Sequence, residues 1–400
     1  MKIVWICHFT NDYIQQKLKV KKRISEFAPW ITLGIEEVKK REDIELHIVS
    51  PHRWINRSKE FIEDNIHYHF FNPGIPFYGR HWPGFFRFDI YTKFWNNKTK
   101  VRRIVDKIKP DIIHLHGFEN AYYSSTIFPL KKKYPIFITV QGFITLQLKK
   151  PISSLSRDMK IKILVEKKIL NNFDNFGIRD NFMKKEILKY NKNAKFFYHE
   201  YFLNINSKYS LRNLKKIYDI IFYARVTRTK GIEDLIDAVG ILKNDFPKIT
   251  VAVIGQGTKE YIGFLKNKIL ENNLNKNISL LGFLPTQEDI FNVLEQSKMY
   301  VIPAYNGDVN GGAIESMTRK IPVIVNDVGG FKYLNEKDEV ALIAKKGDIN
   351  DLASKIRKLL IDDNFREQLS ERAYYYAINR WNNEKALSNI IEAYKTILSY

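Results

Sequence analysis

The sequence predicts an α/β protein made of two Rossmann-like domains whose parallel sheets face each other across a cleft. The length of 400 residues exceeds one ordinary hydrophobic core and suits two cores of about 200 residues each. Short β-branched or aliphatic runs alternate with segments of helical periodicity through both halves, which is typical of parallel sheets with crossover helices. A polar stretch without periodicity, NINSKYSLRNLKKI, lies near the middle and is the best candidate for a linker.

The first domain is assigned to residues 1–204. Its strands are expected near 2–8, 44–49, 111–115, 135–140, 174–178 and 195–199. Its helices are expected near 23–40, 91–108, 119–132, 158–172 and 180–190. The opening run MKIVWICHF is short and lacks a small-residue cleavage site, so it is interpreted as a buried first strand rather than a signal peptide.

The second domain is assigned to residues 218–380, after a linker at 205–217. Strands are expected at 218–224 and near 249–254, 278–281, 299–302, 321–325 and 340–343, with helices between them. Residues 381–400 form a terminal segment with an amphipathic helix from Asn383 to Leu398.

The composition favours a folded, cytoplasmic protein. Hydrophobic residues make up 44% of the chain and charged residues 27%, which are ordinary globular proportions. Cys7 is the single cysteine, which excludes an intramolecular disulfide and a thiolate metal cluster and suits a reducing compartment. The sequence has no run of about 18 consecutive apolar residues, so no transmembrane helix is expected.

The positive charge is concentrated in the first half. Residues 1–205 contain 37 Lys and Arg against 20 Asp and Glu, whereas residues 206–400 contain 28 against 24. Codon bias toward lysine would act on both halves alike and does not explain the difference. The asymmetry favours an anionic partner for the first domain, and both nucleic acid and an acidic membrane surface qualify.

An aromatic segment interrupts the rhythm between residues 66 and 95. Of the 28 residues from Tyr68 to Trp95, 12 are aromatic, and Arg80, Arg87 and Lys93 lie among them. Aromatic rings beside basic groups suit a membrane interface, a sugar-binding surface or stacked bases. An irregular loop whose rings pack on the first domain is an equally good interpretation.

Two groups of residues carry the candidate chemistry. In FYARVTRTKG (222–231), Arg225 and Lys230 follow a strand and precede a helix, which makes a receptor for a diphosphate. In VIPAYNGDVNGGAIESM (301–317), Gly311 and Gly312 precede a helix that carries Glu315, a carboxylate suited to accept hydrogen bonds from vicinal ribose hydroxyls. Each group alone also has a structural interpretation: a basic turn is common, and Glu315 could complement the helix dipole. Both groups fall at strand carboxyl ends, where open α/β sheets bind ligands.

These motifs resemble the donor domain of the retaining glycosyltransferases of family 4, which have the GT-B fold. The matching order is the loop with Arg225 and Lys230, then VAVIGQG, ISLLGFLPTQEDIFNVLEQSKMYVIPAY, GGAIESM and IPVIVNDVGG, over roughly residues 218–345. The resemblance implies that Arg225 and Lys230 hold the donor diphosphate and that Glu315 holds the ribose. It also implies a base pocket and donor contacts at Gly282, Phe283, Leu284, Asp308, Gly311, Gly312 and Ala313.

One departure concerns a second carboxylate. The family pairs two carboxylates eight positions apart, and the position eight before Glu315 is Gly307. Asp308 lies one place later and is the candidate substitute.

The first half resembles the same family more loosely. In KPDIIHLHGFENAYY, the resemblance places His116 beside the donor sugar, as a catalytic residue, and His114 facing the core. In FITVQGF, Gln141 stands where the family usually has a histidine, and the loop HFTNDY around Asn11 lacks the glycines of many members. Asn11 and Gln141 are therefore expected on the acceptor side, and the segment after Trp381 resembles a terminal helix that returns to the first domain.

The resulting hypothesis is a retaining glycosyltransferase that uses a UDP- or GDP-linked sugar, with UDP favoured, and a saccharide acceptor. The sequence has no Asp-x-Asp triplet, so charge neutralisation by Arg225 and Lys230 replaces a metal, and no cofactor is expected. A lipid-linked acceptor in surface polysaccharide or lipopolysaccharide synthesis, at the inner face of an anionic membrane, is the expected setting. The alternatives are a nucleotide-sugar epimerase on the same fold and a basic nucleic-acid-binding protein, although no nucleic-acid-binding motif is present.

Overall fold

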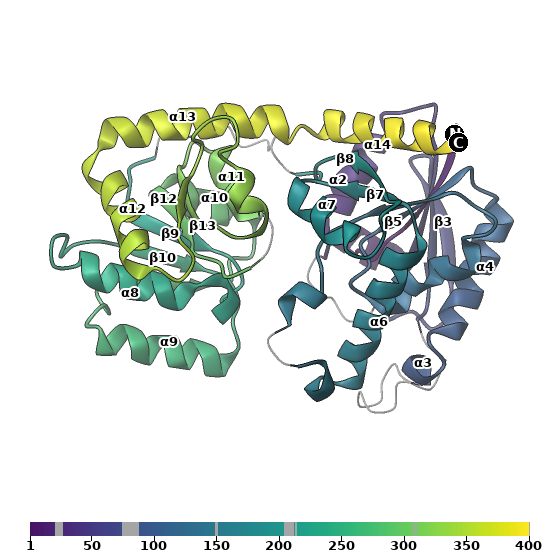
Figure 1. The fold of residues 1–400 in the computed structure, drawn as a ribbon, viewed down its shortest axis with the longest axis horizontal. Coiled ribbons are helices and arrows are strands. Elements are labelled where there is room, and N and C mark those ends of the chain that lie inside the picture. Colours follow the sequence, from purple (N-terminus) through teal and green to yellow (C-terminus); the bar gives the residue numbers. More distant parts are fainter. Residues whose placement is uncertain are drawn as a thin grey trace. The chain divides into compact units, whose positions relative to one another are not determined.

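A computed structural model describes residues 1–20, 27–73, 88–148, 151–203, 212, 214–306, 309 and 311–399. The chain divides into unit 1, which comprises Met1–Leu203 and Asn382–Tyr400, and unit 2, Asn204–Trp381 (Figure 1). Each unit has its own sheet covered by helices, which confirms the predicted α/β class with two mainly parallel sheets. Among the described residues, no helix combines the length and apolar character needed to cross a membrane.

Unit 1 is built on an eight-stranded sheet with the order β3-β4-β2-β1-β5-β6-β7-β8. The strands are β1 (Lys2–Ile6), β2 (Glu45–Pro51), β3 (Lys59–Glu63), β4 (Ile66–Phe71), β5 (Ile112–His116), β6 (Ile136–Thr139), β7 (Asn175–Ile178) and β8 (Lys195–Tyr198). All neighbours pair in parallel except β3 and β4, which pair antiparallel at one edge. The central strands β1 and β5 are buried along almost their whole length because helices cover both faces of the sheet.

Alternate residues of each strand enter two separate cores. Ile3 and Trp5 of β1 join the core under α2 (Pro29–Val38) and α14 (Asn383–Leu398). Val4 and Ile6 join the core on the other face, under α4 (Trp95–Ile108) and α6 (Arg157–Asn172). This alternation follows from the two-residue repeat of a strand. The remaining helices of unit 1 are α1 (Asp12–Lys17), α3 (Phe88–Tyr91), α5 (Ala121–Ser124) and α7 (Asn181–Leu188), with short 3₁₀ turns at Ser125–Leu130, Thr145–Gln147 and Ile152–Ser154.

The structure corrects the expectations for unit 1 in two places. Residues 59–63 and 66–71 form the β3–β4 hairpin, although the sequence analysis assigned no strands there and described an interruption from residue 66. The expected helix at 119–132 is instead α5 followed by a 3₁₀ turn that contains Pro129, which cannot donate a backbone hydrogen bond. Most of the aromatic segment, residues 74–87, lies outside the described residues.

Unit 2 is built on a six-stranded, fully parallel sheet with the order β11-β10-β9-β12-β13-β14. The strands are β9 (Tyr218–Tyr223), β10 (Val251–Ile254), β11 (Ile278–Gly282), β12 (Ser297–Ile302), β13 (Val323–Asn326) and β14 (Leu342–Ala344). The helices are α8 (Ile232–Leu242), α9 (Lys259–Glu271), α10 (Gln287–Glu295), α11 (Gly311–Met317), α12 (Ile349–Ile361) and α13 (Asp363–Arg380), with 3₁₀ turns at Arg228–Lys230 and Gly329–Tyr333.

Side-chain caps fix where several of these helices begin. The side chain of Thr286 accepts a hydrogen bond from the Asp289 amide at the start of α10, and the Asp289 carboxylate accepts from the Thr286 amide in return. Asp348 and Asp362 cap α12 and α13 in the same way through single bonds.

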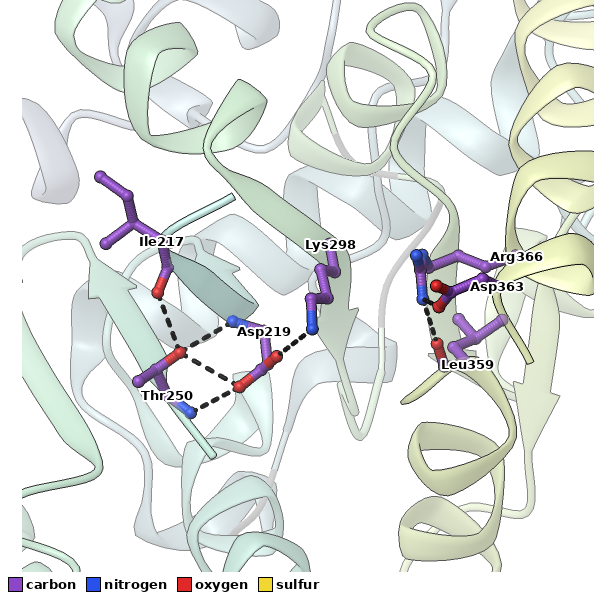
Figure 2. A network of polar contacts seen from close by, with 7 residues as sticks. All are labelled: Ile217, Asp219, Thr250, Lys298, Leu359, Asp363 and Arg366. Carbon is purple, nitrogen blue, oxygen red and sulfur yellow. Dashed lines mark hydrogen bonds and ion pairs between the residues drawn. The ribbon is translucent and has the colours of Figure 1, made fainter. Parts of the chain in front are cut away.

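A polar network holds the amino ends of the unit 2 strands together (Figure 2). Asp219 of β9 accepts a 2.9 Å hydrogen bond from the Thr250 amide, and its other oxygen lies 2.8 Å from the ammonium of Lys298 on β12. The network therefore ties the three central strands at the end of the sheet opposite their carboxyl termini, which leaves the carboxyl edge for a ligand.

Candidate active site

The sheet of unit 2 reverses its strand order between β9 and β12. The chain runs outward from β9 through β10 to β11 on one side, and from β12 through β13 to β14 on the other. The loops that follow β9 and β12 therefore start side by side at the carboxyl edge. Such a switch point is where open α/β sheets bind ligands.

Gly231 allows the two loops to meet. Its φ of 74° is in the left-handed region, and a Cβ built on it would lie 1.8 Å from the carbonyl oxygen of Pro303, after β12. The amide of Tyr305 also donates a 2.9 Å hydrogen bond to the carbonyl of Thr229, after β9. The two loops thus form one rigid surface, and only glycine fits at their closest approach.

Arg225 and Lys230 lie on this surface. Arg225 is exposed and Lys230 is half-buried, and no hydrogen bond or ion pair engages either side-chain cation within the described residues. By contrast, neighbouring Arg228 is paired with Glu233 at 2.9 Å. Burial, and then the charge of Arg225, lower the pKa of Lys230. Two cations held close together without a counter-ion are typical of an anion-binding site.

Glu315 stands at the end of the same surface, on α11. Its Oε1 accepts a 3.0 Å hydrogen bond from Gln287, the first residue of α10. Its Oε2 is buried and has no hydrogen-bond partner among the described residues. Burial raises the pKa of Glu315 to about 7, although Gln287 and the charge of Arg319 both lower it. A buried carboxylate oxygen without a hydrogen-bond partner is free to accept a hydrogen bond from a bound ligand.

Backbone groups complete the edge. Gly311 and Gly312 begin α11, and a Cβ on Gly312 would come 2.9 Å from the Tyr223 carbonyl at the end of β9. Ala313 buries its methyl group beneath them. At the neighbouring end of β11, Gly282 has a φ of 73°, and Phe283 leaves 58% of its surface exposed.

Leu284 follows as a half-buried residue. The predicted donor residues of unit 2 therefore follow β9, β11 and β12 at one edge. Asp308, like Gly307, lies outside the described residues.

His116 ends β5 in unit 1 but points its ring inward. The imidazole lies between Trp5, at 4.6 Å, and His114, at 3.8 Å between ring centroids, and its Nε2 is buried with no hydrogen-bond partner in the described parts of the chain. Burial, and then the charge of His199, lower the pKa of His116 to about 3, so the ring is neutral at pH 7. His114 is fully buried between the hydroxyls of Tyr394 and Thr139.

Asn11 and Gln141 occupy different settings. The Asn11 side chain caps α1 by accepting from the Ile14 amide at 2.8 Å, and it lines a pocket of about 340 Å³ with Tyr13 and Thr32. The Gln141 side chain lies beside Gly117, the residue that follows His116. A carboxylate oxygen of Glu119 lies beside the same glycine.

Glu119 was not singled out from the sequence. Burial raises its pKa to about 7. The sequence held one indication of this: Glu119 comes three residues after His116, at the end of a buried strand. Carboxylates in such positions often have a shifted pKa.

Unit 2 is an open α/β domain with two cations near the switch point of its sheet, an arrangement typical of proteins that bind an anionic ligand there. Comparison with known proteins agrees with this description. Residues 205–376 match the family model described as glycosyl transferases group 1, and the chain is a glycosyltransferase with the GT-B fold.

Two relatives illustrate how far the sequence similarity extends. An uncharacterised glycosyltransferase of Methanocaldococcus jannaschii is 25% identical over 377 residues, which cover 92% of this chain and 94% of the relative. A capsular polysaccharide biosynthesis glycosyltransferase of Staphylococcus aureus is 24% identical over 182 residues, which cover 44% of this chain and 46% of the relative.

Two solved structures share the fold. The sucrose-phosphate synthase of Thermosynechococcus elongatus superposes with a TM-score of 0.77 at 17% identity, over 100% of this chain and 99% of its own. Anabaena HepE in complex with UDP-glucose gives a TM-score of 0.69 at 16% identity, over 99% of this chain and 100% of its own.

Proposed function

We propose that unit 2 binds a UDP-linked sugar at the switch point and that the chain transfers this sugar to a saccharide acceptor. The observation that carries the proposal is a pair of cations at the meeting point of the β9 and β12 loops, Arg225 and Lys230, for which the described residues offer no counter-ion. A nucleotide sugar presents a diphosphate, which takes the charge of both cations at once.

The other donor contacts follow from the geometry of the edge. The unpartnered Oε2 of Glu315 accepts a hydrogen bond from a ribose hydroxyl, while Gln287 holds Oε1. The base lies against the backbone after β11, near the exposed ring of Phe283. Uracil is the favoured base because a structural neighbour, HepE, was solved with UDP-glucose.

In the proposed reaction, an acceptor hydroxyl attacks the anomeric carbon as the bond to the diphosphate oxygen breaks. Attack on the face from which UDP leaves retains the anomeric configuration, and the leaving phosphate takes the acceptor proton. Arg225 and Lys230 neutralise the negative charge that grows on the diphosphate, so the transfer requires no metal ion. On the basis of the family resemblance, His116 is proposed to position the donor sugar, which requires its ring to turn out from its buried place between Trp5 and His114.

The proposed acceptor is a lipid-linked saccharide used in surface polysaccharide or lipopolysaccharide synthesis. A relative of the chain is a capsular polysaccharide glycosyltransferase. Unit 1 supplies Asn11 and Gln141 on the acceptor side, and we place the protein at the inner face of the cytoplasmic membrane.

A basic groove on unit 1 supports the membrane assignment. A pocket of about 230 Å³ has an apolar wall that includes Phe94, Phe128 and Leu164, and three lysines, Lys93, Lys98 and Lys168, line it. Burial, and then the charges of Lys168 and Lys93, lower the pKa of Lys98. Near this groove, Tyr91 and Trp95 leave most of their surfaces exposed. An apolar groove with clustered positive charge suits an acyl chain with an anionic headgroup.

Thermal unfolding with a panel of nucleotide sugars tests the donor assignment. A ligand that binds only the folded state raises the melting temperature, by several degrees at about 100 times its dissociation constant. We expect the largest rise with a UDP-sugar. No rise with any UDP- or GDP-sugar would contradict the proposal, and interconversion of the sugar without an acceptor would identify an epimerase instead.

Sedimentation with vesicles of phosphatidylglycerol and phosphatidylcholine tests the membrane assignment. Binding should fall steeply with salt and disappear without the anionic lipid. Replacement of Lys93, Lys98 and Lys168 by alanine should weaken it, whereas alanine at Lys259, Lys266 and Lys276, three exposed lysines of unit 2, should not. Equal binding to neutral vesicles would rule the assignment out.

A further inference from the structure

A group of imidazole and carboxylate side chains lies on one face of the unit 1 sheet. β2 and β4 are parallel with His47 opposite His67, so Glu45 and His47 of β2 share a face with His67 and His69 of β4. β3 adds Glu60, which pairs in register with His69. The cluster lies toward the amino ends of β2 and β4, whereas His116 lies at the carboxyl end of β5.

The distances within the cluster suit a small metal ion. His47 Nε2 lies 2.9 Å from Glu45 Oε1, and one ligand atom each from Glu45, His47 and His67 lie within 4.8 Å of one another. The rings of His47 and His67 are stacked with centroids 4.3 Å apart. Ligand atoms around a tetrahedral Zn²⁺ are separated by about 3.3 Å, given its usual bond lengths of about 2.0–2.2 Å. Rotation of exposed Glu45 and half-buried His67 suffices to close the remaining gap.

We propose that this cluster binds one Zn²⁺ ion through the Glu45 carboxylate, His47 Nε2 and one ring nitrogen of His67. A water molecule completes the tetrahedron. Two imidazoles and one carboxylate match the nitrogen and oxygen preference of Zn²⁺ and disfavour Mg²⁺, which selects oxygen ligands.

A second layer of contacts orients the central ligand. His47 Nδ1 lies 3.1 Å from His69 Nε2, and Glu60 Oε1 makes a longer contact of 3.4 Å with His69 Nδ1. If His47 carries its proton on Nδ1, that N–H donates a hydrogen bond to His69 Nε2. The Nε2 atom of His47 then has a lone pair available for the metal. A hydrogen bond from the second ring nitrogen of a metal-binding histidine is the usual way in which proteins fix its tautomer.

Glu45 already has a cationic partner at this position. Lys2 contacts Glu45 Oε1 at 3.1 Å, and a bound metal ion would take the place of its ammonium group.

The site joins β2 to β4, next to the β3 edge of the sheet. A metal held across two strands stabilises the folded state because the unfolded chain does not hold the ligands together. We therefore assign it a structural role in unit 1, independent of donor binding in unit 2.

The test is zinc retention by the full chain, prepared without a histidine tag and stripped with a chelator. After addition of ZnCl₂ and gel filtration, elemental analysis should find one zinc per chain, no retained Mg²⁺, and a raised melting temperature. Glu45→Gln, at an exposed position that tolerates the change, and His67→Asn should each lower zinc affinity at least about tenfold. Glu42→Gln, an exposed carboxylate of the same segment, should leave it unchanged.

His69→Leu separates positioning from ligation. Because His69 acts through His47, the variant should still bind one zinc, with affinity lowered by about 10–100-fold. The proposal would be overturned if the parent chain retained no zinc. It would also be overturned if the parent chain, Glu45→Gln and His67→Asn retained zinc equally. UDP-glucose affinity should be the same in all these variants, so failure here is distinct from failure of the donor assignment.

Discussion

Glu315 shows how a single residue can be held ready for a ligand. Its Oε1 accepts a hydrogen bond from Gln287, its buried Oε2 has no partner among the residues that the structure describes, and burial raises its pKa to about 7. Burying an ionised carboxylate that lacks full solvation is unfavourable. A hydrogen bond from a ribose hydroxyl would reduce this unfavourable free energy.

Donor affinity should therefore depend on pH through Glu315. The ionised carboxylate is the better acceptor for ribose, so affinity for UDP-glucose should rise as the pH increases from 6 to 8. UDP-glucose is suited to this calorimetric titration because its diphosphate has no ionisation near pH 7. Glu315→Gln should abolish the pH dependence and weaken binding by roughly 10–150-fold, the value of a hydrogen bond to a charged group. An unchanged pH profile in the variant would refute this role.

The same substitution should stabilise the ligand-free protein at high pH. An acid whose pKa is raised on folding contributes its full stability below the unfolded value of 4.5 and loses it as the pH rises through 7. Glu315→Gln removes that loss, so at pH 8 the variant should unfold with a free energy about 1–3 kcal/mol higher. Equal stability of the two proteins across pH 5–8 would contradict the burial argument.

Some candidate site positions were recognisable from the sequence and others were not. Arg225, Lys230 and Glu315 follow strand ends at recognisable spacings, and the structure brings their loops to one edge. Gln287 and Glu119 were missed because their importance comes from contacts across the fold, with Glu315 and beside Gly117, which sequence spacing does not reveal.

At the scale of elements, the contact between the β9 and β12 loops controls the site. Gly231→Ala places a methyl group against the Pro303 carbonyl at a left-handed φ, so the loops must separate. We expect the variant to lose at least about 2 kcal/mol of unfolding free energy, measured by chemical denaturation, together with affinity for UDP-glucose.

Gly263→Ala is the matched control. Gly263 lies inside α9 with open space around it, so alanine should raise stability by about 0.5–1 kcal/mol. If both alanine variants behave alike, the close approach at Gly231 does not hold the loops together.

The elements that were predicted are those with a regular hydrophobic pattern. β5 and β9 are mainly apolar runs ended by recognisable loops, and α14 matches the expected range of Asn383–Leu398. β3 was missed because an edge strand alternates exposed and half-buried residues, and β4 because its histidines and aromatic residues do not form an aliphatic run. The helix expected at 119–132 was wrong because Pro129 outweighs the surrounding periodicity.

At the scale of the whole molecule, a buried histidine network makes unit 1 sensitive to acid. Thr139 joins His114 to His199 through its hydroxyl, and Tyr394 of α14 holds the other side of His114. Burial lowers the pKa of His199 to about 4. Because this value is below the unfolded one of 6.5, the unfolded chain takes up a proton first, and stability present above pH 6.5 falls as the pH falls toward 4.

A variant isolates this contribution from other titrating groups. His199→Asn should reduce the acid-side slope of stability by about 1.4 kcal/mol per pH unit between pH 6.5 and 4.5. Hydrogen exchange of β5 amides reports on unit 1 separately from unit 2. Parallel stability curves for the two proteins would show that His199 titrates normally in the fold.

The class of the whole molecule followed from its sequence, because two series of alternating strands and helices allow few architectures. The concentration of basic residues in the first half was equally visible, but charge alone did not distinguish a membrane from a nucleic acid. The groove of Lys93, Lys98 and Lys168 favours the membrane because its walls are apolar, and this combination arises from α3–α4 and α6 only after folding.

The central claim is that Arg225 and Lys230 hold the donor diphosphate, and calorimetric titration of UDP-glucose into single variants tests it most directly. Arg225→Ala and Lys230→Ala should each weaken binding by roughly 10–150-fold and slow sugar transfer by roughly 30–1000-fold, equivalent to about 2–4 kcal/mol. Arg228→Ala, which removes a cation already paired with Glu233, should bind like the parent protein. Parent-like affinity in both Arg225→Ala and Lys230→Ala would contradict the account.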